Sequence, residues 1–130
     1  MKVGSLFVGA LLLPMFFKLS LSHFVCDYPL QSEWIARSKS RHAGPPATYD
    51  PKLHGPVARI WPWVLTAHSA THAAGVLLVT GSMVAAIFEL VAHWLIDYCK
   101  CERWYGLNVD QCLHLFTKAL IAVGVIWFGW

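Results

Sequence analysis

The sequence predicts an all-α fold, a multi-pass transmembrane bundle of four helices arranged up-down-up-down. Composition is the first observation behind this prediction: 57% of the 130 residues are hydrophobic and only 13% are charged, whereas soluble domains carry about 25% charged residues. The second observation is that the apolar residues form four runs, at about residues 4–25, 61–79, 83–98 and 112–130. A helix of about 20 apolar residues crosses a bilayer, so we expect each run to span it.

The first run, residues 4–25, is interpreted as a spanning helix rather than a cleaved signal peptide. Its apolar stretch is long for a signal peptide, and no small-residue cleavage site follows it. Pro14 lies inside the run, so we expect a kink in the helix at that point.

A polar loop at residues 29–60 separates the first two runs. Gly44-Pro45-Pro46 interrupts any helix there, so we expect a short helix at the membrane interface followed by extended chain. Thr80-Gly81-Ser82 predicts a tight turn between the second and third runs. Because the later connections are short, we expect antiparallel neighbours within a single transmembrane domain, residues 1–130.

The distribution of lysine and arginine predicts the orientation of the bundle. The loops after the first and third runs hold the basic residues Arg37, Lys39, Arg41, Lys52, Arg59, Lys100 and Arg103. The turn between the second and third runs holds none. Basic loops stay in the cytoplasm, so we expect both termini on the non-cytoplasmic side. The basic residues form no stripe, which argues against nucleic acid as a partner; the sequence leaves the oligomeric state open.

Each run carries two ionisable residues spaced four apart: His23 and Asp27, His68 and His72, His93 and Asp97, Asp110 and His114. Residues four apart lie on one face of a helix, and two side chains so placed can share a metal ion. Each pair lies at the cytoplasmic end of its run. In an alternating bundle the five histidines and three aspartates therefore converge on one layer.

Imidazole and carboxylate groups together suit zinc, iron or manganese, so we expect a divalent metal ion whose identity the sequence leaves open. The preferred ligands are His23, His68, His93, Asp97 and His114, and His72, Asp27 and Asp110 complete the candidate metal set. Three carboxylates are candidate general bases: Glu89, Asp27 and Asp110. In a metal-free alternative, the Asp and His side chains satisfy one another and the cluster is a polar core.

The pattern of these residues resembles a family of small phage and bacterial inner-membrane proteins defined as a domain of unknown function. It comprises His23-x-x-x-Asp27-x-x-Leu30-Gln31, His68, His93-x-x-x-Asp97-x-x-Lys100 and Asp110-Gln111-x-x-His114. The resemblance covers nearly the whole chain and implies a multi-pass membrane protein with a polar intramembrane cluster. A looser likeness links the sequence to predicted membrane-bound metal-dependent hydrolases, which also place His and Asp at helical spacing.

Three classes of function fit these observations. The first is a metal-dependent membrane hydrolase acting on an amphipathic or lipid-like substrate, since the site would lie near the headgroups. The second is a membrane oxidoreductase with a di-iron centre, although this chain has fewer histidines and more aspartates than desaturases. The third is not an enzyme: a proton or metal-ion pathway, a polar core that fixes helix register, or a membrane protein that binds a host partner.

Overall fold

The computed structural model describes the backbone of residues 2–130 and the side chains of residues 9–56 and 59–130. Throughout this part of the chain the regular structure is helical, which confirms the all-α prediction. The helices are α1 (Lys2–Asp27), α2 (Glu33–Ser38), α3 (Pro51–His54), α4 (Val57–Thr80), α5 (Met83–Cys101) and α6 (Leu107–Phe128).

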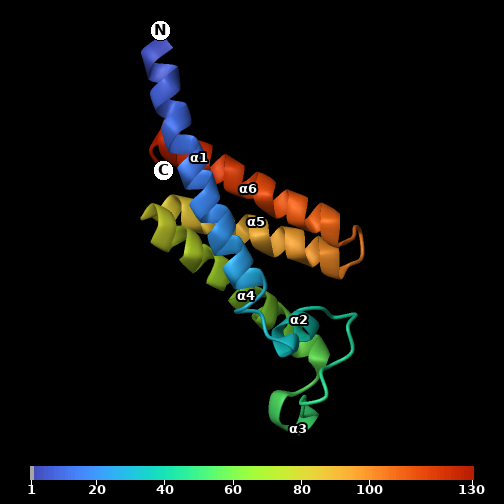
Figure 1. Ribbon diagram of the computed structural model, residues 1–130. Helices are drawn as coiled ribbons and strands as arrows, with labels where there is room; N and C mark the ends of the chain where they lie inside the picture. Colours follow the sequence, from blue (N-terminus) through green and yellow to red (C-terminus); the bar gives the residue numbers. More distant parts are fainter. Residues whose placement is uncertain (1) are drawn as a thin grey trace.

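The four long helices pack as a ring, in which α1 and α5 each contact both α4 and α6. In Figure 1, α1 crosses the other three long helices obliquely, and both termini lie at the same end of the molecule. The two short helices, α2 and α3, pack against α4 at the other end (Figure 1). This arrangement closes the ring around a shared interior.

Capping residues decide where the long helices begin and end. Gly81 ends α4 in the left-handed conformation with φ of 70°, which glycine adopts without a steric penalty. Ser82 then caps α5, because its side chain accepts a hydrogen bond from the Ala85 amide at 3.1 Å. The predicted tight turn is therefore present. The capping residues Pro56 and Gly106 start α4 and α6 before the apolar runs begin, so both helices are longer than predicted.

Two helices are long and apolar enough to cross a membrane by length and composition, Gly9–Asp27 of α1 and Leu107–Phe128 of α6. Of the four predicted spans, the first and the fourth therefore meet this criterion. In α5, Glu89, Asp97 and Lys100 place three charged residues within 19. These residues belong to the polar interior described below.

The interior of the ring has an apolar end and a polar end. Leu19, Val76, Ala85, Ile121 and Ala122 form a buried apolar cluster. In each long helix, the apolar cluster lies between the predicted His and Asp pair and the end of the molecule that holds both chain termini (Figure 1). The other end, beside α2, is filled by buried ionisable side chains.

Candidate metal centre

The eight predicted metal-ligand residues lie together at the polar end of the ring. Seven are buried with exposed fractions of 3% or less, and the Asp27 side chain is 9% exposed. The pairs on α1 and α5 lie near the ends of those helices and the α6 pair lies near its start, as predicted. The α4 pair, His68 and His72, lies in the middle of its helix, because α4 starts at Val57 and its first turns extend past the cluster.

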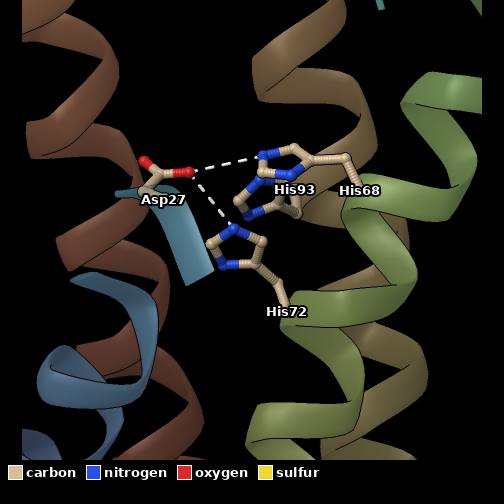
Figure 2. Close-up of side chains that lie close together, drawn as sticks. All are labelled: Asp27, His68, His72 and His93. Carbon is tan, nitrogen blue, oxygen red and sulfur yellow. Dashed lines mark ion pairs between the residues drawn. The ribbon is translucent and has the colours of Figure 1, made fainter. Parts of the chain in front are cut away.

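Asp27 faces three imidazole rings (Figure 2). Its Oδ1 lies 3.3 Å from His68 Nε2 and 3.2 Å from His72 Nε2, and ligand atoms of Asp27, His68, His72 and His93 all lie within 4.8 Å of one another. A tetrahedral ion with bonds of about 2.0–2.2 Å separates its ligand atoms by about 3.3–3.6 Å. The group could therefore hold a divalent metal ion after small side-chain movements.

Asp27 is oriented by a residue of α6. Gln111 Nε2 donates to Asp27 Oδ2 at 2.9 Å, and His23 Nε2 lies 3.4 Å from the same oxygen. These contacts leave Oδ1 directed at the two histidines of α4. A ligating carboxylate is commonly held by such a hydrogen bond to its second oxygen.

His93 is held by a carboxylate in the way that metal-binding histidines usually are. Its Nδ1 lies 3.2 Å from Glu89 Oε1, and Lys118 Nζ donates to that same oxygen. His93 Nε2 has no hydrogen-bond partner among the side chains that the structure describes, and it belongs to the group facing Asp27. Glu89, predicted as a general base, therefore lies where it orients His93.

A second group comprises Asp97, Asp110 and His114, whose ligand atoms also lie within 4.8 Å of one another. Both carboxylates of this group already form ion pairs with lysines. Lys39 donates to Asp97 Oδ2 at 2.5 Å, and Lys100 donates to Asp110 Oδ2 at 2.8 Å. The other oxygens of Asp97 and Asp110 lie 3.3 Å and 3.6 Å from His114 Nε2. A metal ion here would compete with two ammonium groups.

The five histidine rings form a continuous array that joins the two groups. The rings of His72 and His93 stack with centroids 3.7 Å apart, and those of His93 and His114 stack at 4.1 Å. His23 lies 4.9 Å from His114, centroid to centroid. Both ring nitrogens of His72 and Nδ1 of His23 and His114 are buried and lack a hydrogen-bond partner within the described part of the chain. Buried polar atoms normally have a partner, so a bound ion or water fits this donor set.

The charges of the cluster nearly cancel. Four carboxylates and three lysines leave a net charge of −1 when the histidines are neutral (3 − 4 = −1); the residues are Asp27, Glu89, Asp97 and Asp110, and Lys39, Lys100 and Lys118. One divalent ion would change this to +1, whereas two would give +3. The electrostatic balance therefore favours one ion over two, because uncompensated buried charge is costly.

Lys39 reaches the cluster because the polar loop is tied to the end of α5. Arg41 donates two hydrogen bonds to the Glu102 carboxylate, both at 2.7 Å. The hydrogen bonds from Arg41 keep the pKa of Glu102 below its ordinary value, so the carboxylate stays ionised for this contact at neutral pH. Lys39, two residues before Arg41, is 5% exposed and points inward to Asp97.

Sequence reasoning missed four contributors to the cluster. Lys39 was assigned only to a basic loop. Lys100 and Gln111 appeared in the family motif without a role, and Lys118 was not a candidate. Lys118 had a signal, because it continues the four-residue spacing of Asp110 and His114 along one face of α6. Lys39 had none, since it follows α2 in the loop and reaches Asp97 only through the fold. The two histidines of the polar loop, His42 and His54, lie outside the cluster: both are exposed, and His42 contacts Glu102.

Comparison with known proteins identifies the family and leaves the reaction open. Residues 15–129 match a family described as a protein of unknown function, DUF3307. No curated protein and no solved structure matches the chain. The expected likeness to a family of unknown function is therefore confirmed, while the looser likeness to metal-dependent hydrolases stays a prediction. Since the match covers most of its length, the chain belongs to the DUF3307 family.

Proposed function

We propose that this protein is a four-span membrane enzyme with one divalent metal ion, a hydrolase acting on an amphipathic, lipid-like substrate. One observation carries the proposal: in a buried layer, Asp27 Oδ1 lies 3.3 Å from His68 Nε2 and 3.2 Å from His72 Nε2.

The distribution of polarity supports a membrane setting for all four long helices. Buried polar and charged residues fill one end of the interior, while large apolar side chains lie on the outside. In α5, Ile87, Val91 and Leu95 are 52–55% exposed, on the face opposite the buried Glu89 and His93. A soluble domain rarely exposes such continuous apolar surface, and ionisable residues in membrane helices face the bundle interior.

Only 17% of the apolar window of α1 and 33% of that of α6 is buried within the protein. The two helices therefore leave most of their apolar surface for lipid, unlike core helices of a soluble domain. We propose that α4 and α5 also cross the inner membrane. Their polar residues face the cluster, where burying them in the membrane costs little free energy. The lipid bilayer is thus the proposed partner of the outer surface.

The proposed ligands are Asp27, His68, His72 and His93. A divalent ion held by them would act as a Lewis acid and lower the pKa of a water ligand toward neutrality. Gln111 holds Asp27 and Glu89 holds His93, so both ligands are oriented before the ion binds. Zinc, iron and manganese all accept imidazole and carboxylate, and the proposal extends to each of them.

Proton transfer is assigned to His114. Its Nε2 lies 3.3 Å from Asp97 Oδ1 and 3.6 Å from Asp110 Oδ1, and its ring stacks on the ligand His93. An imidazole flanked by carboxylates can accept a proton while they hold its orientation, as in other acid–base sites. Of the three carboxylates predicted as bases, Asp110 is therefore proposed to orient this acceptor, while Asp27 binds metal and Glu89 orients a ligand.

A cavity beside the cluster supports a substrate with an apolar chain. It has a volume of about 620 Å³ and lies between α2 and α4, with Trp34, Ile35, Trp63, Val64, Ala67 and His68 in its wall. His68 is also one of the proposed ligands, so a chain in this cavity would end next to the metal. Ser32 and Thr71 also line it, and an apolar cavity with a few polar groups is typical of ligand sites.

A second candidate is a metal-free polar core, favoured by the near cancellation of charge in the cluster. In that case the ion pairs of Lys39, Lys100 and Lys118 would hold the helices together without an enzymatic role. A di-iron oxidoreductase has less support, because Asp97 and Asp110 already accept hydrogen bonds from lysines where a second iron would need them.

The test is elemental analysis of the protein purified in detergent, combined with hydrolysis assays on long-chain esters and phosphoesters. Wild type should carry about one zinc, iron or manganese ion per chain, and Asp27→Asn and His72→Gln should lose it. Lys18→Gln, at an exposed position of α1, is the matched control and should keep the ion. Hydrolysis should follow metal content and should be weaker on short-chain analogues.

Two results would overturn the proposal. If wild type carries no metal and takes up none from added zinc, iron or manganese, the polar-core function is the better one. If Asp27→Asn and His72→Gln retain the full metal content of the Lys18→Gln control, the ion is bound elsewhere.

A further inference from the structure

A second cavity lies between the end of α2, the loop that follows it and the end of α5, and several basic side chains line it. Its volume is about 370 Å³, and Gln31, Lys39, Ser40, His42, Lys100 and Arg103 contribute to its wall. No carboxylate is among its lining residues, all of which the structure describes. We propose that this cavity binds a phosphate group, in particular the phosphate of an anionic lipid headgroup.

The two lysines are fixed in place while keeping capacity to bind an anion. Lys39 donates to Asp97 and Lys100 donates to Asp110, and an ammonium group has three N–H donors. Each lysine therefore has donors left for a ligand in the cavity. The Lys100 side chain is 30% exposed, so an anion can reach it.

Arg103 supplies the cavity's positive charge that no carboxylate neutralises. It has no ion-pair partner among residues 9–56 and 59–130, unlike Arg41 on the same side of the molecule. A guanidinium group binds phosphate through two parallel N–H donors. Arg103 therefore provides the net attraction, and the two lysines provide further donors.

The backbone at Arg103 gives an independent reason to assign it a ligand. Its φ of 64° makes it the only non-glycine residue in the left-handed region within the described chain. It follows the C-terminal cap of α5, where the Trp104 amide donates to the Cys99 carbonyl at 3.1 Å. This hydrogen bond is typical of a Schellman motif, in which glycine is preferred at the position that Arg103 occupies, directly after the cap. The cap therefore accounts for the left-handed backbone but not for the choice of arginine over glycine, and non-glycine residues held in this conformation cluster at functional sites.

The position of the cavity ties the phosphate to the proposed substrate. The basic cavity and the apolar cavity both include residues of α2, and each includes a residue that contacts Asp97 of the cluster, Lys39 and His68. An amphipathic phosphate ester could place its headgroup in one and its chain in the other. This extension to the substrate rests on the proposed function, whereas phosphate binding itself does not require metal or hydrolysis.

The test is isothermal titration of the detergent-purified protein with three probes: dihexanoyl phosphatidic acid, inorganic phosphate, and the matching neutral dihexanoyl glycerol. The variant is Arg103→Gly, which removes the guanidinium and suits the left-handed backbone, so it should melt no lower than wild type. Arg59→Gln, an exposed arginine of α4 outside the cavity, is the matched control. Phosphatidic acid should bind wild type and the control, and Arg103→Gly should weaken binding by about tenfold or more.

The probes separate the two sources of phosphate. Binding of phosphatidic acid without inorganic phosphate supports a lipid headgroup, and binding of both supports a site for phosphate in general. Equal affinity of Arg103→Gly and wild type, or equal binding of the neutral glycerol lipid, would overturn the phosphate site. If wild type binds phosphate but carries no metal or hydrolyses no substrate, only the proposed function is overturned.

Discussion

At the scale of single residues, the ion pair of Lys118 and Glu89 supports the rest of the cluster. Both side chains are at most 1% exposed, and Glu89 also orients His93. Burying a charge is costly unless a partner compensates it. The orientation of His93 therefore depends on this ion pair, because Lys118 compensates the charge of the carboxylate that holds the ring.

The first prediction removes one member of this pair. Lys118→Met leaves the Glu89 carboxylate buried and unpaired, so the free energy of unfolding should fall by roughly 3–5 kcal/mol. Adding Glu89→Leu should recover most of that loss, because replacing both charges by apolar groups is often neutral. The measurement is unfolding by sodium dodecyl sulfate in mixed micelles. Lys18→Met is the control on the outer surface of α1, and an equal loss in that variant would contradict the prediction.

At the scale of helices, the approach of α1 to α4 determines whether Asp27 meets its histidines. Gly75 of α4 lies against α1: a Cβ at this position would lie 2.3 Å from Ser22 Oγ and 3.6 Å from Cys26 Sγ. Inside a bilayer, small residues allow helix backbones to come close. The absence of a side chain at Gly75 therefore sets the distance across which Asp27 reaches His68 and His72.

The second prediction follows from this contact. Gly75→Val should push α1 away, lower the free energy of unfolding by about 1–3 kcal/mol and reduce metal content, since Asp27 would move away from His72. Ala74→Val introduces the same side chain one residue earlier, at an exposed position, and should change neither quantity. Unfolding and elemental analysis of both variants provide the measurement, and full metal content in Gly75→Val would show that the contact is not limiting.

At the scale of the whole molecule, the number of spans decides where the two termini lie. An even number of antiparallel spans leaves both termini on one side, and Figure 1 has both at one end of the molecule. By the positive-inside rule, the basic loops predict that this side lies outside the cytoplasm.

The third prediction is that alkaline phosphatase fused to the C-terminus is active and a fluorescent protein fused there is dark, as expected outside the cytoplasm. The same pair of reporters at the N-terminus should give the same answer. Opposite answers at the two ends would contradict four spans, while a cytoplasmic answer at both would reverse the orientation.

The fourth prediction concerns pH and applies to the folded protein as a whole. Metal binding needs neutral imidazoles and ionised carboxylates, so protons compete with the ion and metal is released as pH falls. The stability contributed by the metal should therefore be present at neutral pH and lost on acidification. Melting temperature and metal content should fall together in the metal-loaded protein, and the chelated protein should lack this component. Metal retained at a pH well below the ordinary histidine pKa of about 6.5 would contradict the prediction.

Much of the fold followed from local patterns. The four apolar runs predicted the long helices, and the Thr80-Gly81-Ser82 turn joined two of them as expected. The starts of α4 and α6 were misplaced because hydropathy does not report caps, and Pro56 and Gly106 begin these helices in polar sequence. Four spans remain a proposal for a related reason: average hydropathy cannot distinguish a polar residue facing lipid from one facing the cluster.

By itself, the sequence determined the four long helices and the eight ligand candidates, because a spacing of four residues on a helix is a local property that places side chains on one face. It did not predict α3 (Pro51–His54), which lies where extended chain was expected. Only the tertiary structure decided which of those candidates form ion pairs with lysines and which face one another as a group that could hold a metal ion. Lys39 lies 58 residues from its partner Asp97, and Lys118 lies 29 residues from Glu89. No local rule relates positions so far apart. Helix packing brings the charges together, and the cost of burying an unpaired charge makes those contacts necessary.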